Sequence, residues 1–77
     1  MKKLVTKIKF NISGRTLAQT FLSVYDILGH EVAVLVNEVL RPGEYEVDFD
    51  GSNYPSGVYF YKLHTGDFTE TKKMLIL

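Results

Sequence analysis

The chain has 77 residues, in which nine lysines and arginines balance nine aspartates and glutamates, and it contains no cysteine. This length fits one small domain, because a second hydrophobic core would require roughly 50 more residues. A net charge of zero gives no field that would attract nucleic acid or an anionic membrane. The lack of cysteine excludes disulfide scaffolds, thiolate metal sites and cysteine nucleophiles.

The first half of the chain predicts three strands. Residues 6–12 alternate between apolar and polar side chains, which is typical of a strand with one buried face. The apolar run 18–27 predicts a second strand that ends at Leu28-Gly29-His30. Residues 31–40 also fit the spacing of a helix face, but their four valines favour a strand of about five residues.

The second half predicts three more strands. Residues 43–50 show the clearest alternation in the chain. Residues 58–63 and 68–77 are two extended runs that His64-Thr65-Gly66-Asp67 joins, so an antiparallel hairpin is expected. Short strands separated by turn residues predict an all-β fold, an immunoglobulin-like antiparallel β-sandwich of about six to seven strands.

Two turns share a pattern of proline followed shortly by glycine. Pro42-Gly43 and Pro55-Ser56-Gly57 each place a proline, whose φ is fixed, shortly before a glycine that is free to adopt a positive φ. Both are predicted to be tight turns at the start of a strand. The side chains of Asp26 and Asn53 are expected to hydrogen-bond turn backbone nearby.

Few residues offer an arrangement suited to chemistry. His30 and His64 lie in turn-like segments without a recognisable catalytic partner, so surface histidines are expected. The segment 48–53 superficially resembles a calcium loop, but Asn53 and Tyr59 stand where an EF-hand needs glycine and glutamate. No metal site is therefore predicted.

The acidic side chains indicate a solvated face rather than a catalytic pair. Glu44, Glu46 and Asp48 alternate along one strand, so they point to the same side of it. Each turn glycine stands alone, and no glycine-rich phosphate loop occurs. We predict no enzyme activity, no cofactor, no small-molecule substrate and no nucleic-acid partner.

Five short motifs follow one another from about Thr6 to the end of the chain. They are Val24-Tyr25-Asp26-Ile27-Leu28-Gly29-His30-Glu31-Val32, Leu35-Val36-Asn37-Glu38, Pro42-Gly43-Glu44-Tyr45, Pro55-Ser56-Gly57-Val58-Tyr59-Phe60-Tyr61 and Thr71-Lys72-Lys73-Met74. Each motif is weak alone, but their order and spacing are specific. Together they resemble the C-terminal sorting domain family of the type IX secretion system, also called the Por secretion system.

The resemblance implies a C-terminal secretion and sorting signal. Domains of this family have an immunoglobulin-like sandwich at the end of a larger bacterial protein, and the secretion machinery recognises them from its periplasmic side. The cargo then crosses the outer membrane. A sortase-like cysteine protease usually removes the domain and can attach the cargo to lipopolysaccharide. The implied location is periplasmic in transit, then secreted or at the cell surface.

The resemblance also implies candidate recognition residues. Adjacent lysines in a strand point to opposite faces, so at least one lysine of the last motif is expected to be exposed. Turn geometry alone accounts for the two glycines. Carried over from the family's motifs, the candidates for partner recognition are Pro42, Gly43, Tyr45, Gly57, Tyr59, Lys72 and Lys73.

The start of the chain departs from the family. Residues 1–5 stand in place of the Asn-Pro-rich linker that usually leads into the first strand. We expect them to be an expression start or a linker remnant, followed by a single sorting domain at 6–77 that has been separated from its cargo.

Two other expectations concern partners. An immunoglobulin-like or fibronectin-like accessory module would instead use exposed Tyr59 and Tyr61 as a platform for glycan or protein. The apolar end Met74-Leu75-Ile76-Leu77 predicts self-association if the last strand lies at a sheet edge.

Overall fold

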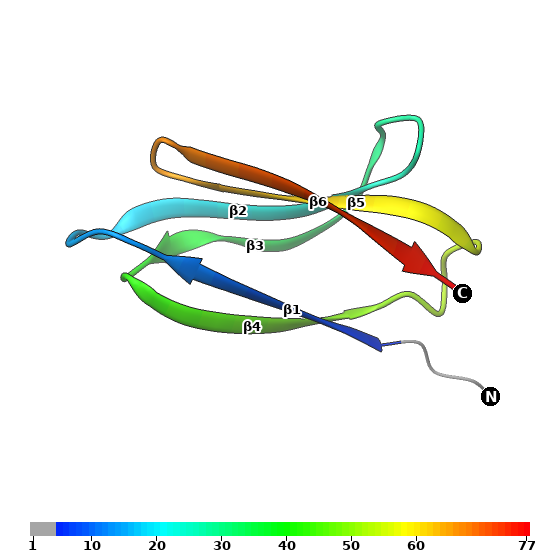
Figure 1. Ribbon diagram of the computed structural model, residues 1–77, viewed down its shortest axis with the longest axis horizontal. Coiled ribbons are helices and arrows are strands. Elements are labelled where there is room, and N and C mark those ends of the chain that lie inside the picture. Colours follow the sequence, from blue (N-terminus) through cyan, green and yellow to red (C-terminus); the bar gives the residue numbers. More distant parts are fainter. Residues whose placement is uncertain (1–4) are drawn as a thin grey trace.

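The computed structural model describes residues 5–77, which form six antiparallel strands and no helix (Figure 1). The prediction of an all-β chain with about six strands is confirmed. Within residues 5–77 there is no helix of the length and apolarity that crossing a bilayer requires. The strands are β1 (Val5–Ile12), β2 (Ala18–Tyr25), β3 (Glu31–Leu40), β4 (Gly43–Asp50), β5 (Gly57–Thr65) and β6 (Phe68–Ile76).

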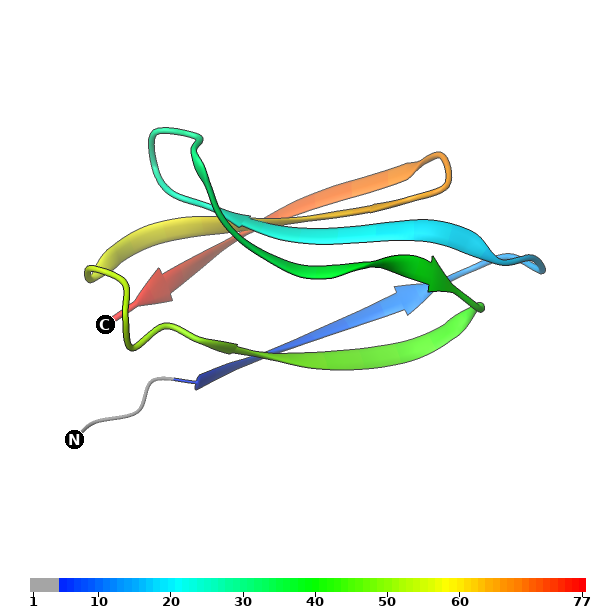
Figure 2. The ribbon, with the colours of Figure 1, turned by 180° about the vertical axis from the view of Figure 1, so that it is seen from behind.

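The strands form two sheets of unequal width. One sheet has two strands in the order β1-β4, and the other has four in the order β3-β2-β5-β6. Figures 1 and 2 show the β1–β4 ribbon lying across one face of the larger sheet. The arrangement is compatible with the predicted immunoglobulin-like sandwich.

The ambiguous segment 31–40 is a strand, but it is ten residues long instead of about five. Its pairing with β2 is interrupted by register shifts at Leu22/Ser23 and Val24/Tyr25. Each bulge moves the following side chains relative to the two faces of the sheet. A long bulged strand therefore shows the apolar spacing that resembled a helix face.

Two predicted strand ends are also wrong. β2 ends at Tyr25 rather than at residue 27, because Asp26 already starts a hydrogen-bonded turn. β5 continues to Thr65, so the hairpin to β6 turns on Gly66 and Asp67 alone and not on four residues. β5 is longer than predicted because His64 and Thr65 pair with both β2 and β6.

The hydrophobic core draws on all six strands. β1 and β4 contribute Ile8 and Phe49, which pack with Leu22 and Val24 of the central strand β2. The residues Val36, Tyr59, Leu63 and Ile76 complete this buried cluster. Tyr59 and Leu63 lie on the same face of β5, and both are buried.

A threonine pair lies within this apolar environment. The hydroxyls of Thr20 and Thr65 are 3.0 Å apart, and both residues are buried. The Thr20 hydroxyl donates to the Ala18 carbonyl at 3.1 Å, so its oxygen accepts the hydrogen of Thr65. In the described part of the chain, every buried side-chain nitrogen and oxygen has a partner.

The predicted boundary between an expression start or linker remnant at 1–5 and a single domain at 6–77 stays a prediction. Residues 1–4 lie outside the described part of the chain, and Val5 is the first residue of β1. β1 pairs with β4 from Val5 onward, opposite Asp50.

Replacing the buried Leu22 with alanine tests the core. We expect Leu22→Ala to lower the free energy of unfolding by about 2–5 kcal/mol, because it leaves a cavity in the centre of the sandwich. Leu17→Ala is the matched control, since Leu17 is exposed between β1 and β2. Urea denaturation followed by circular dichroism measures both, and equal losses would contradict this core.

Candidate functional site

Two tyrosines close the turns that lead into β4 and β5. The Tyr45 hydroxyl donates to the Arg41 carbonyl at 2.6 Å, and the Tyr59 hydroxyl donates to the Pro55 carbonyl at 2.8 Å. In each case the acceptor lies four residues before the tyrosine. Tyrosine corners of immunoglobulin-like domains use the same bond from side chain to upstream backbone.

A glycine stands two residues before each tyrosine and starts the strand. Gly43 and Gly57 both have a φ of +149°, a region that glycine adopts without strain. A β-carbon at either position would meet nothing within 4 Å. Only the backbone conformation therefore demands glycine there, as the sequence predicted for both turns.

Neither corner tyrosine projects outward from the sandwich. Tyr45 is half-buried and stacks on Phe10 with ring centroids 5.4 Å apart. Tyr59 is buried and meets the ring of Tyr54 edge-on at 6.3 Å. Tyr61 is half-buried against the core. These positions give no support to an exposed aromatic platform for glycan.

Lys72 and Lys73 are both exposed on β6, an edge strand of the larger sheet. Lys72 pairs with Tyr61 and shares its inward face, whereas Lys73 pairs with Phe60 and points to the outer face. The expectation of at least one exposed lysine is confirmed. The inward-facing lysine is exposed because the narrow β1–β4 sheet does not cover this part of β6.

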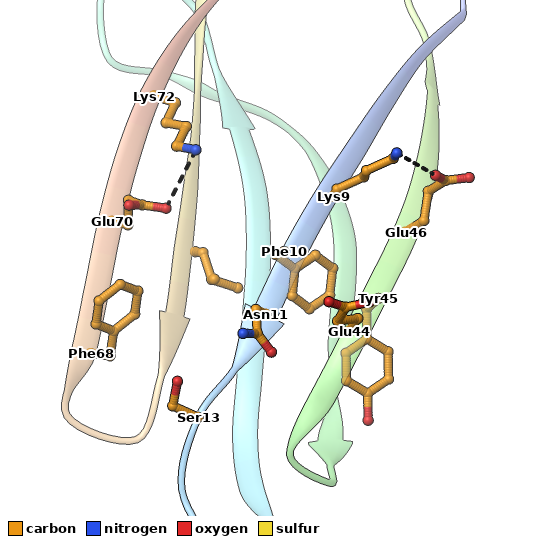
Figure 3. Close-up of a pocket in the computed structure, with 11 residues that line it drawn as sticks. Lys9, Phe10, Asn11, Ser13, Glu44, Tyr45, Glu46, Phe68, Glu70 and Lys72 are labelled. Atoms are coloured by element: carbon orange, nitrogen blue, oxygen red, sulfur yellow. Dashed lines mark ion pairs between the residues drawn. The ribbon is translucent and has the colours of Figure 1, made fainter.

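An open groove of about 760 Å³ runs between β1 and β6 (Figure 3). Its apolar lining includes Phe10, Leu63 and Phe68. On the β6 side, the Lys72 ammonium lies 3.8 Å from the Glu70 carboxylate. Within residues 5–77 no three His, Cys, Asp or Glu side chains are grouped so as to hold a metal ion.

The acidic face of β4 is solvated, as predicted. Glu44, Glu46 and Asp48 are all exposed. The Lys7 ammonium lies 3.4 Å from the Glu46 carboxylate and 3.9 Å from that of Asp48. Exposed pairs of this kind contribute little to stability.

The two histidines are exposed, but only one lies in a turn. His30 is in the turn between β2 and β3, where its ring lies 3.4 Å from the Asp26 carboxylate. His64 is within β5, where Nδ1 lies 3.0 Å from the Thr69 hydroxyl. The prediction that His64 belongs to a turn is wrong, because β5 extends beyond it.

The loop 26–30 is held by four hydrogen bonds. The Asp26 carboxylate accepts from the backbone N–H of Leu28 at 2.9 Å and from that of His30 at 2.8 Å. Backbone bonds link the Asp26 N–H to the His30 carbonyl and the Gly29 N–H to the Asp26 carbonyl. The predicted bonding of Asp26 to turn backbone is confirmed.

At the turn before β5, Asp50 rather than Asn53 accepts a hydrogen bond from backbone, namely from the Ser52 N–H at 2.9 Å.

The loop 26–30 displays two large apolar side chains. Ile27 is 69% exposed and Leu28 is 77% exposed. Figure 1 shows the connection between β2 and β3 standing out from the body of the sandwich. Turns usually carry small or polar residues, so the apolar pair Ile27-Leu28 between Asp26 and Gly29 is a sequence signal for this loop, although none of the predicted recognition residues lies in it.

A shallow hollow connects this loop to the outer face of the larger sheet. It has a volume of about 300 Å³ and is lined by Ile27, Phe60, Lys62 and Thr71, among others. Lys73 shares the outer face of β6 with Thr71. The protruding loop and the outer face near Lys73 thus form one continuous surface. Lys72, on the inward face, instead lines the groove shown in Figure 3.

Comparison with known proteins identifies one family. A family model described as "secretion system C-terminal sorting domain" matches residues 3–77, and the match includes all six strands. No curated protein and no solved structure matches the chain significantly.

Removing the corner hydroxyls should destabilise the domain. We expect Tyr45→Phe and Tyr59→Phe each to lower the free energy of unfolding by about 0.5–1.5 kcal/mol, because each loses one hydrogen bond to a turn carbonyl. Thermal and urea unfolding measure the loss. Leu17→Phe serves as a control for surface substitutions, and an unchanged stability in both tyrosine variants would contradict the role of the corners.

The loop should open in acid. The backbone N–H of His30, with smaller contributions from Leu28 and from the imidazole, holds the pKa of Asp26 below its usual 3.8. A lowered pKa stabilises the loop above the unfolded-state pKa, and this stabilisation is lost as pH falls through the folded-state value. Amide NMR shifts of Leu28 and His30 should therefore titrate with a midpoint below 3.8. Asp26→Asn should abolish that titration, and a midpoint above 3.8 would contradict the assignment.

Proposed function

Because the chain belongs to the secretion system C-terminal sorting domain family, and is thereby a C-terminal sorting signal for type IX secretion, we propose that the machinery reads it by direct contact with its folded surface. A signal of this kind directs a cargo protein out of the cell, to the medium or the cell surface. The family is not known to be catalytic.

The observation that carries the proposal is the loop 26–30. Ile27 and Leu28 are exposed apolar side chains on a loop that Asp26 and backbone bonds already hold in one conformation. A partner that buries them loses little conformational entropy, because the loop is ordered before binding. An apolar pocket on a protein of the secretion machinery is the complementary surface.

Lys73 extends the same contact surface. It lies on the outer face of β6, which continues from the loop through the hollow that Lys62 and Thr71 line. Two lysines beside an apolar loop complement an apolar pocket with an acidic rim. Opposite charges at such a rim speed association and set orientation more than they raise affinity.

The other candidate residues fall into two groups. Lys72 faces the groove beside β1 and offers a second, separate cation to a partner. We assign Pro42, Gly43, Tyr45, Gly57 and Tyr59 to the maintenance of the two corners, an indirect role in recognition. On this proposal they shape the surface without touching the partner.

Finer steps of sorting are part of the same proposal. Recognition takes place on the periplasmic side, and a sortase-like protease acts on the exported protein at the cell surface. The resemblance to the family supports both steps. Self-association through β6 is a separate proposal, because nothing in sorting requires it.

An export assay tests recognition. Residues 1–77 are fused behind a periplasmic reporter in a bacterium that has the type IX machinery, and reporter is measured in the periplasm, at the surface and in the medium. We expect export of the wild type and at least tenfold less export of the double variant Ile27→Ser, Leu28→Ser, since a pocket that buries two apolar side chains loses roughly 3 kcal/mol or more without them.

Two comparisons make the assay decisive. Leu17→Ser alters another exposed leucine, outside the loop, and should be exported normally. Lys72→Ala with Lys73→Ala should reduce export less than the loop variant does. Circular dichroism shows whether each variant is folded. Retention of the wild type in the periplasm would refute the sorting function, whereas normal export of the folded loop variant would refute only the loop as the contact.

A further inference from the structure

β6 offers a regular, unpaired strand edge. It pairs with β5 over nine consecutive residue pairs without a register shift, and within residues 5–77 its other edge has no neighbouring strand. The opposite edge of the sheet, β3, carries two register shifts against β2. Bulged edges are poor templates for further pairing, so β6 is the edge better suited to receive another strand.

The inward face of β6 has an alternating pattern that is uncovered from Phe68 to Lys72, whereas Met74 at its end is half-buried against the core. Phe68, Glu70, Lys72 and Met74 lie on this face, opposite Thr65, Leu63, Tyr61 and Tyr59 of β5. Phe68 is 51% exposed, and the side chains of Glu70 and Lys72 are 49% and 53% exposed. An apolar residue, an acid, a base and an apolar residue thus follow one another at every second position.

This order is complementary to itself when the strand is reversed. We propose that two copies of the domain pair through β6 in an antiparallel, two-fold symmetric arrangement centred on Thr71. Glu70 then lies opposite the partner's Lys72, and Lys72 lies opposite the partner's Glu70. Phe68 and Met74 form the apolar pairs at either end. Directly opposed side chains in an antiparallel pair are close enough to interact, and opposite charges stabilise such pairs.

The charges also disfavour the neighbouring registers. A register centred on Glu70 places that carboxylate against its own copy and Phe68 against Lys72. A register centred on Lys72 opposes two ammonium groups and sets Glu70 against Met74. Like charges directly opposite each other are destabilising, and charged residues on the inward face of an edge strand limit pairing with unrelated strands. The pattern therefore selects one register and one partner, a second copy of this chain.

Sedimentation equilibrium of residues 1–77 over a concentration series tests the proposal. We expect a monomer–dimer equilibrium in the wild type. Lys72→Glu and Glu70→Lys should each raise the dissociation constant on the order of tenfold, because both symmetry-related pairs become like-charged. The double variant Glu70→Lys, Lys72→Glu restores opposite charges and should restore dimerisation. A wild type that stays monomeric at every concentration would overturn the proposal.

Cysteine cross-linking tests the register. Because the chain contains no cysteine, a single introduced cysteine can form a disulfide only with its own copy in a second chain. Thr71→Cys should form a disulfide-linked dimer under mild oxidation, because the two copies of residue 71 lie opposite each other. Thr69→Cys is the matched control on the same face of β6, and its two copies would be four residues apart, roughly 13 Å. Equal cross-linking of both variants, or efficient cross-linking of Thr69→Cys alone, would overturn this register. Neither experiment depends on export, so the outcome is independent of the sorting function.

Discussion

The unequal width of the two sheets determines most of what this domain displays. Two strands cannot cover four, so the small sheet buries the centre of the larger one, including Leu22 and Leu63, and leaves the start of β6 uncovered. Charged residues can occupy inward positions of β6 only because water still reaches them there. The groove beside β1, the exposure of both lysines and the open strand edge are consequences of this one mismatch.

A domain of this size has a small hydrophobic core, and hydrogen bonds from side chains to turn backbone add to its stability. A small domain buries only about 60% of the surface that its unfolded chain exposes. Tyr45 and Tyr59 bind turn carbonyls, while Asp26 and Asp50 bind turn N–H groups. Each of these bonds fixes the entry or exit of a strand without a disulfide or a metal. The hydrogen bonds of Asp26 likewise hold the loop 26–30 in one conformation, in which it presents apolar side chains to water.

The alternation of side chains predicted the strands well wherever pairing is regular. It predicted the bounds of β4 and the antiparallel pairing of β5 with β6, but not the end of β5. It also misjudged the length of β3, because bulges change which face a side chain occupies. Of the candidate site, the lysine pair could be predicted as exposed, since neighbours in a strand point to opposite faces. The burial of Tyr59 depends on how the two sheets pack, which local sequence does not specify, whereas the apolar pair Ile27-Leu28 beside Gly29 is a local signal for an exposed apolar loop.

The distribution of these features bears on how a sorting signal is read. The loop 26–30 and Lys73 are far apart in the sequence, and the fold joins them through the hollow on the outer face of the larger sheet. A short linear peptide could not reproduce that surface, so recognition through it requires the folded domain. The proposed β6 pairing lies along the strand edge, beside the inward face, and leaves the outer face accessible. Self-association and recognition through the loop 26–30 and Lys73 can therefore occur on the same molecule, whereas Lys72 is a contact that both proposals use.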